Sequence, residues 1–244
     1  MCGRFVSSSP PDKVAAYFDV GSVAEQLLDR GPNFNTAPTT DVMVVRSDGS
    51  TRRLDAFRWG LVPSWAKDMK IGARMINARA ETVATKPAFR SALAKRRCII
   101  PADGFYEWTT EPGRKKKQPY YIHRPDGEPY AFAGLWEVWK GPKGGAEEGT
   151  EAEPLRSCAI ITTSANEPMS ELHDRMPVML PRSAWEQWLA PDEHDTDLLG
   201  KLLVPAPSEL IAFHAVSTEV NSARNRGEHL IDEVDPAAEP DDQA

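Results

Sequence analysis

Apolar and polar residues alternate over several short segments of the chain, which is the pattern of strands that bury one face. The segments VMVVR (42–46) and TRRLDAFRW (51–59) flank the turn sequence SDGS, so we expect them to form a β-hairpin. Further apolar runs bounded by turn residues predict strands at 98–101, 104–108, 119–124, 130–139, 157–163 and 209–216.

Other segments repeat their apolar residues with the spacing of a helix, which predicts helices at 10–18, 22–30, 87–97, 182–189 and 193–203. Asp12 and Ser22 are candidate caps of the first two, and Pro87 stands in the first turn of the third. Many short strands with scattered helices, and no regular alternation of the two, predict an α+β fold. We expect a single domain with a mainly antiparallel sheet.

Composition is that of a folded protein, with 41% hydrophobic and 27% charged residues in a chain of 244. No apolar run approaches the ~20 residues that a membrane span needs. The N-terminus also lacks a charged start followed by an apolar stretch, which is the mark of a secretory signal. We therefore expect a cytoplasmic protein without a membrane partner.

The formal net charge of −7 is unevenly distributed along the chain. Residues 228–244 contain seven acidic residues and no Lys or Arg, so the rest of the chain has no net charge. The segment 144–153 adds four more acidic residues in a predicted surface loop (140–154), and we expect the tail 232–244 to be disordered. The remaining body is mildly basic, which permits an anionic partner.

The three cysteines, Cys2, Cys98 and Cys158, are odd in number and form no CxxC pair, which argues against disulfides and structural zinc. Cys98 and Cys158 lie in apolar runs and are predicted to be core residues. Cys2 has no such context, and we expect its thiol to be open on the N-terminal side. No histidine has the spacing of a metal ligand, so neither a metal nor another cofactor is expected.

Three polar residues lie within apolar segments: Asn77 in ARMINARAET, Glu107 in GFYEW and His173 in ELHDRMP. A carboxyl group among aromatic side chains favours its neutral form, which suits a general acid or base, and a histidine can shuttle a proton. Each residue alone also has a common structural explanation: a turn residue, an exposed strand position and a hydrogen-bonded structural histidine. The basic run 114–117 is most simply a solvated hairpin tip.

Taken together, these segments resemble a known family. Its motifs occur here in the family's order, as MCGRF, NTAPT (35–39), RWGLVPSW (58–65), INARAET (76–82), PADGFYEW (101–108), AFAGLWE (131–137) and ELHDRMPVML (171–180). The sequence is similar to the SRAP (SOS response-associated peptidase) family, also called abasic-site processing proteins, over residues 2–231. The resemblance implies a twisted, partly barrel-like, mainly antiparallel sheet with peripheral helices.

The resemblance also implies a function in the DNA damage response. Family members bind single-stranded DNA and link their N-terminal cysteine covalently to the aldehyde of an abasic site. The positions that match the family's active site are Cys2, Asn77, Glu107 and His173. Those that match its DNA-contacting positions are Arg4, Asn35, Pro38, Trp65, Arg79, Thr162 and Arg175. One departure is Ala66, where some members have a second tryptophan that wedges beside the lesion.

The chemistry follows from an N-terminal cysteine. Removal of Met1 exposes an α-amine beside a thiol, and this pair can condense with an aldehyde to a five-membered thiazolidine. We expect Glu107 to move protons at the amine, His173 to open the sugar ring and Asn77 to orient the reacting groups. The imine stage would also permit β-elimination, and hence a lyase side activity.

Two other functions remain open at this stage. An N-terminal nucleophile with Asn and His nearby also describes a cysteine peptidase or amidohydrolase, and Met1 removal could then be autocatalytic. The protein could instead be a single-strand binding module with an incidental cysteine, which predicts equal affinity for intact and abasic strands. Peptide turnover, or stoichiometric capture of abasic DNA, separates these alternatives. We expect a monomer.

Overall fold

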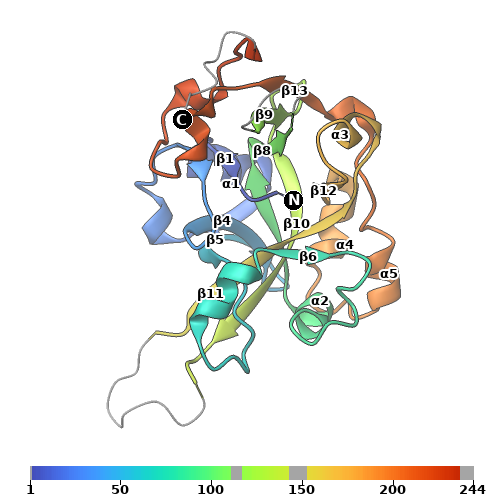
Figure 1. Ribbon diagram of the computed structural model, residues 1–244. Helices are drawn as coiled ribbons and strands as arrows, with labels where there is room; N and C mark the ends of the chain where they lie inside the picture. Colours follow the sequence, from blue (N-terminus) through green and yellow to red (C-terminus); the bar gives the residue numbers. More distant parts are fainter. Residues whose placement is uncertain (1, 111–116, 143–152, 237–244) are drawn as a thin grey trace.

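Two β-sheets form the centre of the molecule, and the computed structural model describes them within residues 2–110, 117–142 and 153–236 (Figure 1). The first sheet has five strands, in the order β13 (Ala212–Ala215), β9 (Gln118–His123), β8 (Gly104–Thr109), β1 (Phe5–Ser7) and β3 (Asn33–Thr36). All of its neighbouring strands are antiparallel. The sheet therefore places the N-terminal strand β1 directly beside β8.

The second sheet has eight strands and closes partly on itself. Its order is β12 (Arg175–Pro177), β11 (Leu155–Ser164), β10 (Tyr130–Trp139), β7 (Arg97–Ala102), β4 (Asp41–Ser47), β5 (Arg52–Trp59) and β2 (Val20–Val23), with β6 (Asn77–Arg79) on β11. Strand β11 also pairs with β5, so β5, β4, β7, β10 and β11 form a closed barrel. The pairs β11–β5, β11–β6 and β2–β5 are parallel and the rest antiparallel, which confirms the predicted fold class.

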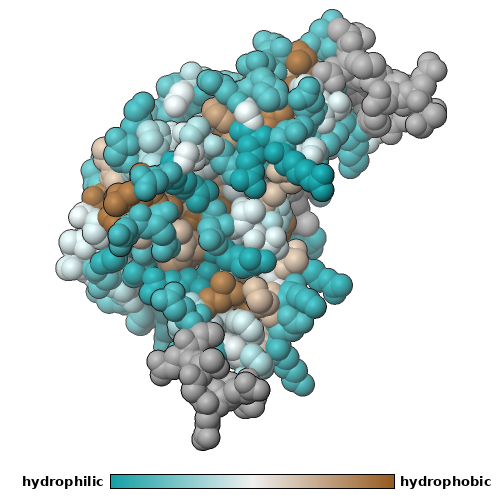
Figure 2. All heavy atoms as spheres, turned by 90° about the vertical axis from the view of Figure 1, so that its left-hand side faces the viewer, coloured by the Kyte–Doolittle hydropathy of each residue, from teal (hydrophilic) through white to brown (hydrophobic). Residues whose placement is uncertain are grey.

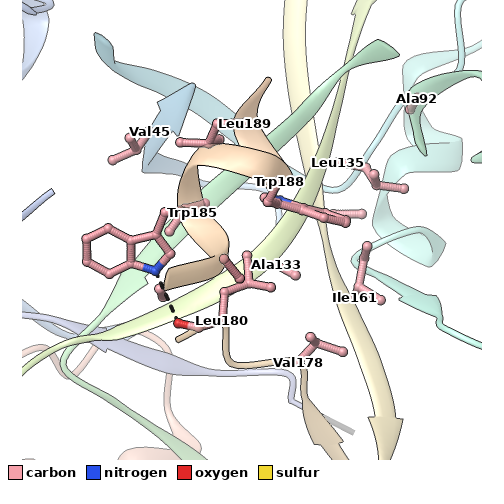
Figure 3. Close-up of a cluster of buried hydrophobic side chains, with 14 of the residues drawn as sticks. Val45, Ala92, Ala133, Leu135, Ile161, Val178, Leu180, Trp185, Trp188 and Leu189 are labelled. Atoms are coloured by element: carbon pink, nitrogen blue, oxygen red, sulfur yellow. Dashed lines mark hydrogen bonds between the residues drawn. The ribbon is translucent and has the colours of Figure 1, made fainter. Parts of the chain in front are cut away.

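Short helices lie at the periphery of the sheets (Figure 1). They are α1 (Pro11–Tyr17), α2 (Arg90–Lys95), α3 (Glu167–Ser170), α4 (Trp185–Leu189) and α5 (Thr196–Gly200). Helix α4 contributes two tryptophans to the core (Figure 3): Trp188 Nε1 donates to Cys98 O at 2.8 Å and Trp185 Nε1 donates to Leu180 O at 3.1 Å. None of the helices in the described ranges has the length and apolarity of a membrane span.

The long strands and the hairpin agree with the sequence predictions, whereas some helices do not. The predicted helix 22–30 is wrong, because Val20–Val23 instead pairs with β5 and only Glu25–Leu27 makes a 3₁₀ turn. Sheet pairing by β-branched residues here overrides the helical spacing. Helix 87–97 is shortened to α2 because β7 takes over at Arg97, and helix 193–203 is shortened to α5.

Glu233 and Val234, at the start of the segment predicted to be a disordered tail, pair with the sheet. Glu233 forms a β-bridge with Val216, and Val234 N donates to Ala215 O at 3.0 Å, so the chain follows the edge of β13 beyond residue 232. Residues 237–244 of the tail, 143–152 of the acidic loop and 111–116 of the basic hairpin tip lie outside the described residues.

Gly104 begins β8, where the neighbouring strand β9 leaves no room for a side chain. A Cβ atom at this position would lie 2.3 Å from Tyr121 Cε2 and 2.6 Å from the backbone oxygen of Ile122. We predict that Gly104→Ala lowers the free energy of unfolding by about 3 kcal/mol, because the backbone cannot give way as a flexible side chain could. Urea denaturation measures the change; Gly31→Ala, with open space around the Cβ and no positive φ, is the contrasting variant and costs less.

Candidate active site

The predicted catalytic residues come from both sheets. Cys2 precedes β1, and Glu107 lies on the neighbouring strand β8, since Phe5 pairs with Phe105. Asn77 begins β6, which pairs with β11, and His173 lies just before β12 on the other side of β11. The two groups meet where Asn77 Nδ2 donates to the carbonyl oxygen of Cys2 at 2.8 Å.

Cys2 is fully buried among apolar side chains of the core, which differs from the expectation of an open thiol. Its Sγ lies 3.8 Å from Arg4 O, which can accept a hydrogen bond from the thiol. Burial raises the pKa of the Cys2 thiol well above its ordinary value, and the charge of Glu107 raises it further. The group is therefore a neutral thiol near pH 7, because neither effect favours a thiolate.

Glu107 is also buried, with only 3% of its surface exposed. The alternative that it occupies an exposed position on β8 is wrong. Burial raises the pKa of the Glu107 carboxyl, against an opposing effect of Lys117, which follows the hairpin tip. A carboxyl group with a raised pKa can both take and return a proton close to neutral pH.

His173 has a defined proton arrangement. Its Nδ1 accepts the backbone N–H of Arg175 at 3.0 Å, so the neutral ring has its proton on Nε2. Burial lowers the pKa of His173, whereas Asp174, whose Oδ1 lies 2.7 Å from Nδ1, raises it. Donation from Nδ1 to Asp174 needs a proton on that nitrogen, in the protonated ring or in the other neutral tautomer, so the two contacts belong to different states of the ring.

A polar cavity of about 560 Å³ opens beside His173. Its lining residues are Arg79, Glu81, Thr82, His173, Asp174 and Arg175. Glu81 binds Arg175 in a bidentate pair at 2.6 and 3.0 Å, and Arg175 Nη2 also donates to Thr162 O at 2.7 Å. Arg79, by contrast, is exposed. The cavity thus has two guanidinium groups beside His173. That of Arg175 is held by Glu81 and Thr162, whereas that of Arg79 makes no hydrogen bond within the described residues.

The other predicted DNA-contacting residues have different environments. Trp65 is 55% exposed and Pro38 is half-buried, whereas the neighbouring Ala66 is buried. Asn35 and Thr162 are buried, so neither side chain offers a surface to a ligand. Thr162 serves instead as an anchor, since its carbonyl oxygen holds Arg175.

Arg4 and Asn35 form one hydrogen-bonded unit inside the protein. Arg4 Nη1 donates to Asn35 Oδ1 at 2.7 Å and to Val220 O at 3.0 Å. Asn35 Nδ2 lies within 3.1 Å of the carbonyl oxygens of Val220, Ser222 and Asn225. Both residues therefore hold the C-terminal part of the chain against β1 and β3.

Sequence reasoning did not predict two residues that position the site. Glu81 follows Arg79 in INARAET and fixes Arg175, as described above. Asp103 accepts the backbone N–H groups of Ser8 and Ser9 at 2.6 and 2.8 Å, which anchors the end of the strand that carries Cys2. In the sequence, Asp103 is visible only as an acidic residue in the turn Ala102–Gly104. Its partners Ser8 and Ser9 lie far away in the chain, so the sequence does not reveal its anchoring role.

Asn35 gives a test of this arrangement. We predict that Asn35→Ala lowers the free energy of unfolding by about 2 kcal/mol, because a buried hydrogen-bonded amide is removed. Asn35→Asp keeps an oxygen that accepts from Arg4 but removes the N–H donors to the carbonyl oxygens of Val220, Ser222 and Asn225. The stability that this variant loses therefore reports on the bonds that Nδ2 makes. Thermal unfolding measures both; wild-type stability of Asn35→Ala would contradict the role as an anchor.

Comparison with known proteins identifies the family of the chain. A family model described as SOS response associated peptidase (SRAP) matches residues 1–223. The chain belongs to the SRAP family. Within the described residues of this SRAP chain, no three His, Cys, Asp or Glu side chains gather as a metal site would require.

Several relatives of the SRAP chain have names that refer to abasic sites. Abasic site processing protein YoqW of Bacillus subtilis is 44% identical over 236 residues, which cover 95% of this chain and 99% of that protein. Abasic site processing protein HMCES of Gallus gallus is 38% identical and covers 92% of this chain, with 75% of its own length matched. The crystal structure of a protein from Bacteroides thetaiotaomicron has a TM-score of 0.82 at 26% identity, covering 96% of this chain and all of that one.

Proposed function

We propose that the protein binds single-stranded DNA as a monomer and captures an abasic site covalently through Cys2, once Met1 has been removed. The observation that carries the proposal is the hydrogen bond from Asn77 to Cys2 O, which fixes the N-terminal residue where the two sheets meet. The buried Glu107, whose pKa is raised by burial, and the half-buried His173, whose pKa is lowered by burial, support it, because both side chains can take part in proton transfer. The names of the relatives support the abasic site as the substrate.

The order of bond formation follows from the state of the thiol. While Met1 is attached, the Cys2 nitrogen is an amide and does not react with aldehydes. Its removal creates an α-amine with an ordinary pKa of ~7.7–8.0, whereas the buried thiol keeps its proton. The amine therefore attacks C1′ of the open sugar first, and the resulting carbinolamine loses water to give an imine. Sγ then bonds to the imine carbon and its proton passes to the nitrogen, which completes the thiazolidine.

Each catalytic side chain has one role in this scheme. Glu107 takes a proton from the attacking amine and returns it to the carbinolamine hydroxyl, which leaves as water. His173 in its protonated form donates the Nε2 proton to the sugar ring oxygen while the anomeric hydroxyl loses its proton to water, which breaks the C1′–O4′ bond and exposes the aldehyde. Asn77 holds Cys2 in the orientation that brings its amine to the carbon, which supplies proximity.

The DNA strand is bound by a separate set of groups. Arg79 is exposed beside the cavity and can contact a phosphate, and Arg175 presents its guanidinium there from its pair with Glu81. We assign the exposed Trp65 and the half-buried Pro38 to contacts with the strand. Elimination from the imine would release the 3′ side of the strand, which is the lyase side activity.

A thiolate-based peptidase fits this site less well. Such an enzyme needs a cysteine with a lowered pKa, whereas burial raises the pKa of the Cys2 thiol. The two functions differ in stoichiometry. Mixed with an abasic oligonucleotide, the protein should form one denaturation-resistant complex per chain, and with an unmodified oligonucleotide none. Turnover of a peptide that depends on Cys2, without such a complex, would refute the proposal.

A further inference from the structure

The segment 217–227, here called the C-terminal segment, is held beside the active site from several directions. Arg4, two residues from Cys2, donates to the carbonyl oxygens of Val220 and Asn221 at 3.0 and 3.4 Å. Trp108, next to Glu107 on β8, donates its Nε1 to Asn221 Oδ1 at 2.7 Å. Because consecutive Cα atoms are ~3.8 Å apart, these contacts place the segment within a few residue lengths of both catalytic groups.

The backbone of this segment is also fixed. Asn35 Nδ2 binds three of its carbonyl oxygens, and Phe34 N donates to Arg226 O at 3.3 Å, which ties it to β3. Within the segment, Asn225 Nδ2 donates to Glu219 O at 2.8 Å. In Figure 1 it lies at the upper left of the molecule, and Figure 2 shows the face of that side to be predominantly hydrophilic.

Two arginines are among the side chains that this segment exposes. Arg224 and Arg226 are exposed, and within the described part of the chain neither guanidinium makes a hydrogen bond or an ion pair. The nearby acid Glu219 is bound to His229, with Oε2 3.2 Å from Nε2. Arg30 adds a third positive charge: burial lowers its pKa, and Arg226 lowers it further, although Asp41 opposes this. Arg224 and Arg226 are therefore two positive charges without an ion-pair partner among the described residues, whereas Asp41 offsets the charge of Arg30.

We propose that Arg224 and Arg226 bind phosphates of the DNA strand next to the abasic nucleotide, on the side of the C-terminal segment. This inference rests on the proposed function and adds a second phosphate site to that of Arg79 and Arg175. Arg4 and Asn35, which sequence reasoning assigned to DNA, act here as positioning residues: they fix the backbone from which the two arginines project. A flexible tail with the same charges would lose more entropy on binding than this anchored segment does.

The test is the salt dependence of binding to an unmodified single-stranded oligonucleotide, measured by fluorescence anisotropy. Arg224→Ala/Arg226→Ala should raise Kd about tenfold at low salt and reduce the slope of log Kd against log salt by about 1.4, that is ~0.7 per lost contact. Arg224→Lys/Arg226→Lys should keep the slope. Arg90→Ala/Lys95→Ala removes two exposed charges from α2, on the opposite side of Figure 1, and should leave Kd and slope unchanged.

The outcomes separate this inference from the proposed function. If the wild-type protein neither binds the single strand nor captures an abasic site, the proposed function fails and the inference fails with it. If the wild type does both and the double alanine variant keeps the wild-type slope, only the phosphate site on the C-terminal segment is wrong. An equal loss in Arg90→Ala/Lys95→Ala would also overturn it, because the effect would then reflect overall charge.

Discussion

Cys2→Ala abolishes stable capture of abasic DNA. The variant still exposes an α-amine after Met1 removal, so it forms the imine, but without Sγ no ring can close on the imine carbon. We expect the amount of complex that survives denaturation to fall by a factor of about 100 or more. This is the size of effect expected when an intramolecular nucleophile is lost. Borohydride should restore a covalent complex by reducing the imine, which shows that the amine step is intact. Denaturing electrophoresis with and without borohydride measures both effects.

Cys158→Ala is the matched control for this experiment. Cys158 is equally buried and belongs to the same apolar cluster as Cys2, so its replacement also removes a buried thiol. We expect it to cost about 1 kcal/mol of stability and to keep full capture. An undiminished denaturation-resistant complex with Cys2→Ala would rule out the thiazolidine.

Glu107→Gln should slow capture about 100-fold or more and at the same time stabilise the protein. The rate falls because glutamine cannot take the proton of the amine. The stability gain follows from linkage: the folded-state pKa of Glu107 is raised by burial, so proton binding favours the folded state. This stabilisation of the folded state by the proton on Glu107 is complete below the pKa of ~4.3 that the group has in the unfolded chain. It is lost as the pH rises through the pKa of the group in the folded protein. The Tm of Glu107→Gln should therefore exceed that of the wild type near neutral pH, with a difference that shrinks toward pH ~4.

Glu137→Gln provides the contrast, since Glu137 is the other buried glutamate of the described sheets. Its Oε2 lies 2.8 Å from Arg96 Nη2, and glutamine would break this ion pair. We expect Glu137→Gln to lose stability and to keep the capture rate. A Glu107→Gln variant that is less stable than the wild type and captures DNA at the wild-type rate would contradict the assignment of Glu107 as the proton-transfer group.

The long strands could be predicted from the sequence because their apolar runs are bounded by turn residues. Strands β1, β3, β6 and β12 could not, since three or four residues are too few to show a period. These short strands nevertheless position the site. They exist because longer neighbours offer them free backbone groups, as β11 does on one side for β6 and on the other for β12.

Residue types and motif order were enough to name the candidate residues, but they could not say which way each one faces. Arg4 and Asn35 match DNA-contacting positions of the family, yet their hydrogen bonds hold the C-terminal segment. Partners some 185 residues away in the chain leave no local signal. The burial of Cys2 is a similar case, because the side chains that cover it come from distant strands.

The intact mass of the protein after incubation with an abasic single-stranded oligonucleotide tests the central claim most directly. We predict one species, whose mass is that of the chain without Met1 plus one oligonucleotide minus one water. This mass reports the removal of Met1, the one-to-one stoichiometry and the condensation in a single measurement. A protein that retains Met1 and still forms the complex, or one that lacks Met1 and remains uncombined, would contradict capture through the aminothiol of Cys2.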